Sequence, residues 1–227
     1  MNAQTLQAEP RLVKLLTRLD GAAEPMSQQR ADAMFARIAW SRITEPGDGV
    51  AGMLLASIGA ERALDLVVQS ARAEVLRDAV NEHPAGTETG LSARAATEAM
   101  NRWAPRLHRG ETVLDIERAC ESRLKVVLPG DTLWPVMLDD LGAHAPNMLW
   151  ARGELQHLSA RSLGVVGARA ATGYGSHVTA ELIDGVCGAG LAIVSGAAYG
   201  IDAVAHRTAL AAGAPTIAVV AGGADRP

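Results

Sequence analysis

Residues 163–220 alternate three short apolar runs with two longer segments of helical periodicity, and this alternation constrains the fold more than any other feature of the chain. The apolar runs are LGVVG, LAIVSG and PTIAVV. Between them, residues 175–189 place Val178, Leu182 and Val186 on one helical face, and residues 201–212 form a second helical segment that ends before Gly213. Short strands that alternate with helices pair in parallel through right-handed crossovers. The sequence therefore predicts an α/β unit with the order β-α-β-α-β.

The part of the chain before this unit has the apolar spacing of helices. Met34, Phe35 and Ile38 share one face of a predicted helix, and Ser92 is placed to cap another that runs to Trp103. We therefore expect a helical N-terminal domain over residues 1–122, a connecting segment with short strands over 123–161, and a partial Rossmann-like domain over 162–227. The apolar run KVVL is the first of the short strands expected in the connecting segment.

The net charge of −4 argues against a protein that coats duplex DNA, because such proteins carry an excess of basic residues. Residues 1–122 and residues 123–227 each hold slightly more acidic than basic side chains, so any nucleic-acid site is expected to be local. The two cysteines, Cys120 and Cys187, have no CxxC pattern and no histidine at ligand spacing. We expect no disulfide, no metal site and no cofactor, and a location in the reducing cytoplasm.

Membrane targeting is not expected. The first thirty residues include Glu9, Asp20 and Glu24 and have no continuous apolar core. The uncharged stretch 208–224 is shorter than the roughly 20 residues that a spanning helix needs. It is also interrupted at Gly213 to Pro215, which fits a helix end followed by a buried strand better.

Three glycine-rich loops follow the predicted strands, at residues 167–175, 195–200 and 221–225. The carboxyl ends of parallel strands meet at one edge of a sheet, where free backbone amides and helix dipoles favour an anion. Glycine lets the backbone approach such an anion closely, and Arg169 is the only cation in the first loop. A phosphate site at this edge is favoured over loops that merely form tight turns. A dinucleotide site fits less well, because the first loop is not GxGxxG and no acidic residue follows the second strand.

The side chains around these loops suggest further roles. Asp202 lies at the start of a helix, where a carboxylate stabilises the N-terminus and can order the loop. His206 lies one turn later and can pair with Asp202. We expect a loop-ordering hydrogen bond rather than an acid–base couple, and no catalytic residue. Tyr174 and Tyr199 could stack on bases, although Tyr199 could equally pack beneath its loop.

Several motifs resemble those of the DprA/Smf family. Gly167-Ala168-Arg169 is similar to the family's GSR-type motif, with alanine in place of the commoner serine. The segment from Ser195 to Asp202, with His206 one turn on, is similar to its SGxAxGID…H motif. PGDTLWPVMLDDL and MLWARG resemble the segment that leads into the family's Rossmann-like domain, and the helical part is compatible with its small SAM-like domain.

The resemblance implies a protein that holds incoming single-stranded DNA during DNA uptake and hands it to a RecA-type recombinase. It implies that the chain ends within the Rossmann-like domain, so that the rest of the sheet and the interface of a possible homodimer are missing. The residues expected to contact single-stranded DNA or its phosphates are Gly167, Ala168, Arg169, Tyr174, Ser195, Gly196, Ala197, Ala198, Tyr199, Gly200 and Ile201.

Two other functions stay open at this point. LOG-type nucleotide phosphoribohydrolases have a similar sheet and phosphate cradle, but their PGGxGTxxE motif is absent from this sequence. The chain could instead be an interaction module whose helical half recruits a protein partner. Residues 46–59 weakly resemble a helix-hairpin-helix motif. We prefer to interpret them as part of a small helical bundle.

The order of the strands has a consequence for stability. In the usual doubly wound order the third strand lies outside the second. The first strand would then have one unpaired apolar edge, which is a template for association. We therefore expect a marginally stable chain that associates and binds DNA more weakly than a version with a completed sheet.

Overall fold

The computed structural model describes residues 9–21, 25–69, 71–82 and 90–224. These residues fall into two compact units, Met1–Ala151 and Arg152–Pro227, and each is described by itself. In the described part of the chain no helix is both long enough and apolar enough to cross a bilayer. The division falls inside the segment 123–161, so the first part of that segment belongs to the helical unit.

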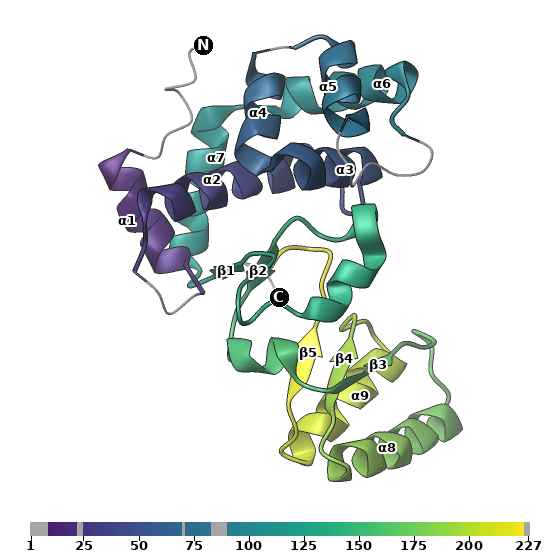
Figure 1. Ribbon diagram of the computed structural model, residues 1–227. Coiled ribbons are helices and arrows are strands. Elements are labelled where there is room, and N and C mark those ends of the chain that lie inside the picture. Colours follow the sequence, from purple (N-terminus) through teal and green to yellow (C-terminus); the bar gives the residue numbers. More distant parts are fainter. Residues whose placement is uncertain (1–8, 22–24, 70, 83–89, 225–227) are drawn as a thin grey trace. The chain divides into compact units, whose positions relative to one another are not determined.

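The first unit is a helical bundle with a small two-stranded sheet (Figure 1). The strands β1 and β2 pair antiparallel, and Lys125 lies opposite Ala151. The helices and strands of this unit are α1 (Pro10–Leu19), α2 (Gln28–Ile43), α3 (Gly49–Ile58), α4 (Ala60–Val68), α5 (Ala73–Asn81), α6 (Ala93–Trp103), η2 (Ala104–Arg106), α7 (Arg109–Glu121), β1 (Lys125–Val127), η3 (Val136–His144) and β2 (Leu149–Ala151).

The core of the helical unit is centred on two tryptophans. The rings of Trp40 and Trp103 meet edge to face with their centroids 5.0 Å apart, and both side chains are fully buried. Each indole N–H has an acceptor: Trp40 donates to the carbonyl of Ala60, and Trp103 donates to the carboxylate of Asp48. These bonds remove the cost of burying the two indole N–H groups, so the rings hold α2 and α6 together.

A shared arginine fastens the two ends of the helical unit to each other. The Arg30 guanidinium on α2 binds the Asp20 carboxylate at 2.6 Å and the Asp131 carboxylate at 2.9 Å. Both carboxylates are nearly buried, and the two hydrogen-bonded partners raise the pKa of Arg30 above its ordinary value. Asp131 also accepts the amide of Leu128, so the turn after β1 is held against α2.

The second unit is the predicted β-α-β-α-β arrangement, in parallel and with the strand order β3-β4-β5 (Figure 1). Its elements are η4 (Leu155–Ser159), β3 (Ser162–Val165), α8 (Gly173–Gly188), β4 (Ala192–Ser195), α9 (Ile201–Ala211) and β5 (Thr216–Ala218). Both crossovers advance in the same direction across the sheet, so right-handed connections place α8 and α9 on the same face. The third strand lies outside the second, as expected, and β3 forms the other edge.

The helix α8 begins two residues earlier than the glycine spacing predicted. Thr172 is its N-cap, and the Thr172 hydroxyl accepts the amide of Gly175 at 3.0 Å. The small core beneath this helix joins Ile183 of α8 to Ile193 of β4 and Ala205 of α9. This packing fixes the two helices and therefore the loops that precede them.

Candidate phosphate-binding site

The loops after β3 and β4 lie at one edge of the sheet because the two strands run in parallel. Val165 is in register with Ser195, so both strands end at the same level. The buried hydroxyl of Ser195 donates a hydrogen bond of 2.8 Å to the carbonyl of Val165. Ser195 therefore ties the two strand ends together, and its hydroxyl is engaged in the sheet.

Two glycines bring these loops into direct contact. Gly200 has a φ of +83°, and a β-carbon there would lie 2.2 Å from the Ala168 carbonyl oxygen and 2.4 Å from that of Arg169. A β-carbon at Gly167 would lie 2.6 Å from the Cβ of Ile201. Only glycine fits at position 200 without moving the backbone of the first loop, and only glycine fits at position 167 without moving the Ile201 side chain. The spacing of these glycines therefore reflects an interlock between the loops.

The backbone of the second loop presents amide groups that have no acceptor within the described residues. Those of Gly196, Ala197 and Tyr199 belong to this group, whereas the amide of Ala198 donates to the Asp202 carboxylate at 3.4 Å. The amide of Ile201 donates to the carbonyl of Ala168 at 3.2 Å. Ile201, which the sequence placed among the contact residues, therefore has a supporting position beside Gly167.

Arg169 is exposed at the tip of the first loop. Its guanidinium makes no hydrogen bond or ion pair with any residue in the described part of the chain. The free amides of the second loop and the free guanidinium of Arg169 belong to interlocked loops at the same edge of the sheet. Such a set of donors suits an oxyanion with several acceptor oxygens.

His206 does not pair with Asp202, contrary to the expectation from their spacing. The Nδ1 atom of His206 lies 2.7 Å from the Thr216 hydroxyl, which donates to the carbonyl of Ile193. Since that hydroxyl uses its proton on Ile193, it accepts a hydrogen bond from His206. His206 thus links α9 to β5, and Asp202 alone orders the loop through Ala198. The partner in β5 could not be found by spacing within one helix.

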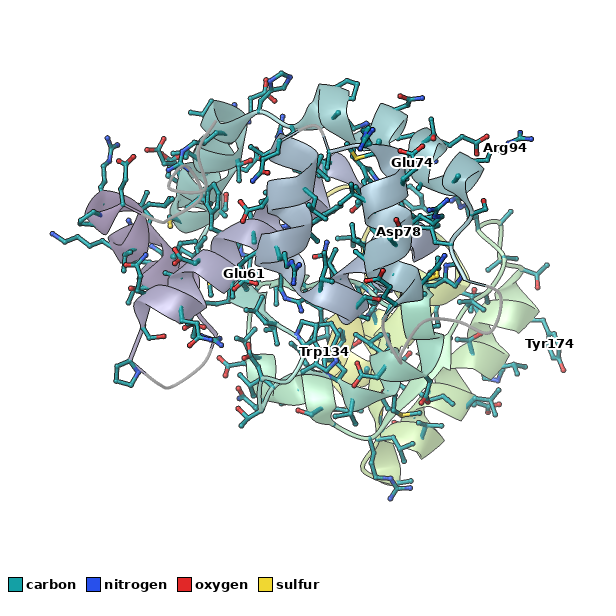
Figure 2. The ribbon with its side chains drawn as sticks, turned by 45° about the horizontal axis from the view of Figure 1, so that its top comes forward. Glu61, Glu74, Asp78, Arg94, Trp134 and Tyr174 are labelled. Carbon is teal, nitrogen blue, oxygen red and sulfur yellow. The ribbon has the colours of Figure 1, made fainter. Side chains whose placement is uncertain are left out.

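Tyr174 and Tyr199 are both exposed, by 80% and 85%, so neither side chain packs beneath its loop. Figure 2 shows Tyr174 projecting outward from the beginning of α8. In the third loop, Gly222 and Gly223 lie among the described residues and Asp225 lies outside them. In the described segments, His, Cys, Asp and Glu side chains form no group of three or more that could hold a metal ion.

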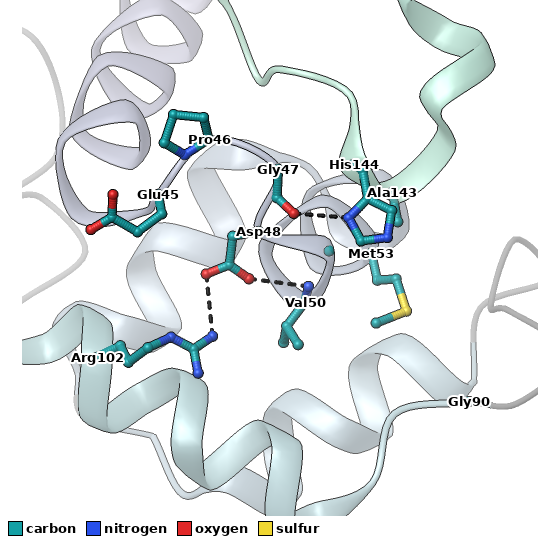
Figure 3. Close-up of a pocket in the computed structure, with 11 residues that line it drawn as sticks. Glu45, Pro46, Gly47, Asp48, Val50, Met53, Gly90, Arg102, Ala143 and His144 are labelled. Atoms are coloured by element: carbon teal, nitrogen blue, oxygen red, sulfur yellow. Dashed lines mark hydrogen bonds and ion pairs between the residues drawn. The ribbon is translucent and has the colours of Figure 1, made fainter. Parts of the chain in front are cut away.

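The helical unit has a separate cavity of about 590 Å³ at the turn before α3 (Figure 3). The carboxylate of Asp48 accepts the amides of Val50 and Ala51, each at 3.2 Å. The Asp48 carboxylate therefore accepts hydrogen bonds from the amide groups that a helix-hairpin-helix motif would offer to a DNA phosphate. This turn packs the bundle, in agreement with the preferred interpretation of residues 46–59.

The structure is thus a helical unit followed by a Rossmann-like α/β unit with glycine-containing loops at the carboxyl edge of its sheet. Residues 125–227 match the family model of DNA recombination-mediator protein A. Over these residues, which make up less than half of the chain, the sequence is similar to the DprA/Smf family.

Curated relatives show the same similarity. A putative DNA processing protein DprA of Mycobacterium tuberculosis is 42% identical over 125 residues, which cover 50% of this chain and 32% of the relative. DprA of Bacillus subtilis is 43% identical over 79 residues, which cover 34% of this chain and 27% of that protein. The matched part therefore spans about a third of the length of these relatives.

A solved structure supports the fold. The X-ray structure of DNA processing protein A from Streptococcus pneumoniae superposes with a TM-score of 0.53 at 23% sequence identity. The superposition covers 83% of this chain and 56% of the other. The helical region followed by a small parallel sheet is thus the fold of that relative as well.

Proposed function

We propose that the interlocked loops after β3 and β4 bind a phosphate of single-stranded DNA, and that the protein acts in DNA uptake and recombination. The observation that carries this proposal is the set of free amides of Gly196, Ala197 and Tyr199, on a loop interlocked with the one that carries the free guanidinium of Arg169. Backbone amides bind phosphate without adding net charge, so the proposal agrees with a chain whose net charge is −4.

The residues proposed to contact the DNA are Arg169 and the amide groups of Gly196, Ala197 and Tyr199. Gly167, Gly200 and Ile201 hold the two loops against each other, and Asp202 orders the second loop. The description of the matching family model as a recombination-mediator protein supports transfer of the bound strand to a RecA-type recombinase. We propose that this transfer takes place in the cytoplasm and without chemical turnover. Incubation with nucleoside monophosphates tests the last point, because release of free base would contradict it.

Fluorescence anisotropy with a labelled single-stranded oligonucleotide, and with a duplex of the same length, tests the binding site. We expect tighter binding to the single strand and a shallow dependence on salt, because one arginine and a few amides contact few phosphates. Arg169→Ala should weaken binding and reduce the magnitude of the salt slope by about 0.7, the amount for one contact to a single strand.

Arg207→Ala is the matched control, because it removes the same charge from an exposed position in the second turn of α9. It should leave both the affinity and the salt slope close to those of the wild type. Equal affinities of wild type and Arg169→Ala across the salt titration would contradict the assignment of this loop.

A further inference from the structure

The carboxyl edge of the second unit is unusually apolar for a nucleic-acid site. Among the described residues of the loop segments 166–172, 196–200 and 219–224, Arg169 is the only charged one, and Asp225 of the third loop lies outside the described residues. The same segments expose large apolar side chains: Val166 by 87%, Tyr199 by 85% and Val219 by 65%. An edge with one cation and several exposed apolar groups suits a ligand that combines phosphate with flat apolar surfaces.

Tyr199 is held in this position by a stiff loop. Ala197 has a φ of +56°, which is a costly conformation for a residue with a β-carbon, and Gly200 has a φ of +83°. The carbonyls of Ala168 and Arg169 press against Gly200, and Asp202 holds the amide of Ala198. The residues on both sides of Tyr199 are therefore fixed while its side chain remains in solvent.

The contact at Gly200 also places Tyr199 next to the proposed phosphate site. The Cα atoms of Tyr199 and Gly200 are about 3.8 Å apart across a trans peptide. Since Gly200 touches the backbone of Ala168 and Arg169, the backbone of Tyr199 lies next to the loop that carries the free guanidinium. In a nucleotide strand, bases lie close to the phosphates of their own backbone.

We infer that Tyr199 is a stacking platform for an unpaired base, which makes the site selective for single strands through the base rather than through charge. This inference rests on the proposed function and assigns the selectivity of that site to one side chain. Base–aromatic stacking tolerates any base, because every base has a π-face. A duplex keeps its bases stacked on each other, so it cannot offer one to Tyr199 without unpairing.

The test compares two labelled oligonucleotides of equal length, one of deoxythymidine and one in which tetrahydrofuran abasic residues replace the nucleosides. Both carry the same phosphates. We expect the wild type to bind the deoxythymidine strand between about five and 150 times more tightly, the range for one stacked base. Tyr199→Phe should keep this difference, and Tyr199→Leu should lose most of it while its salt slope stays unchanged.

Leu210→Ala is the matched control, because it truncates a side chain that is 66% exposed near the end of α9. It should keep the preference for the strand with bases. Equal affinity of the wild type for the two strands, or a preference that survives in Tyr199→Leu, would overturn the inference and leave the phosphate site standing. Failure of the wild type to bind either strand would overturn the proposed function and the inference with it.

Discussion

The α-carbon of Gly200 lies against the carbonyl oxygen of Ala168, so close that a β-carbon there would be 2.2 Å from that oxygen. The amide of the next residue, Ile201, donates to the same oxygen. The Ala168 carbonyl of the first loop thus makes the closest contact with the second loop and also accepts a hydrogen bond from it. The shape of the proposed site depends on this single contact.

Gly200→Ala should destabilise the second unit and abolish DNA binding. We expect the free energy of unfolding to fall by about 1–3 kcal/mol from backbone strain alone, because φ is positive at this residue. Gly185→Ala on α8 is the control, since a β-carbon there meets nothing within 4 Å. It should be neutral or stabilising by up to about 1 kcal/mol. Urea denaturation measures the free energy of unfolding of both variants.

Gly196→Val should reduce oligonucleotide affinity more than it reduces stability. Gly196 does not have a positive φ, and a β-carbon there would lie 3.2 Å from the Asp202 carboxylate oxygen, which is a tight but tolerable contact. The branched side chain would cover the amides proposed to bind phosphate. Melting temperature and anisotropy separate the two effects, and unchanged values of both would show that this glycine is incidental.

Arg30→Ala should unfold the helical unit more easily, because it removes a cation shared by two nearly buried carboxylates. We expect a loss of roughly 2–4 kcal/mol, slightly less than for a fully buried pair. Arg11→Ala breaks an ion pair whose arginine is 85% exposed, and it should cost no more than about 1 kcal/mol. Similar losses in the two variants would argue against a structural role for the Arg30 contacts.

Cys120 should make the helical unit less stable in alkaline solution. Burial raises the pKa of its thiol above the ordinary value of 9.0, and the thiol contacts the carbonyl of Leu15. The folded state therefore holds this proton more tightly than the unfolded state, so stability falls as the pH rises above 9.0. Urea denaturation measures the free energy of unfolding of the wild type and of Cys120→Ala below and above pH 9.0. The difference between these two free energies should change with pH only above pH 9.0.

The open edge of β3 should make the chain associate. β3 pairs only with β4 among the described strands, and Leu163 is 42% exposed. We expect light scattering to rise with protein concentration and the thermal transition to be broad. Leu163→Lys should reduce the association, because a charged residue on an edge strand discourages pairing. A monodisperse wild type with a sharp transition would contradict this prediction.

The order of strands and helices in the second unit could be predicted because it depends on local patterns. The apolar runs LGVVG, LAIVSG and PTIAVV have the length and composition of buried strands, and all three form strands in parallel, but only β4 is largely buried, whereas β3 and β5 are partly exposed. Gly59 separates α3 from α4, and Ser92 caps α6, since both effects act within one turn of a helix. The glycine-rich loops follow from the same patterns, which is why the sequence predicts a site at this edge of the sheet.

The contacts that shape the site join residues far apart in the sequence, and only the tertiary structure decided them. Spacing suggested that His206 would pair with Asp202 one turn away, but β5 brings Thr216 closer in space. Residues 125–151 looked like part of a connector, yet they pack with the helical unit. The sequence by itself determined which segments are strands, helices and glycine-rich loops, because hydrophobic period and capping are local. Packing of α8 and α9 on the sheet decided that Gly200 meets Ala168 and that Tyr199 stays in solvent, since these relations depend on how separate segments meet.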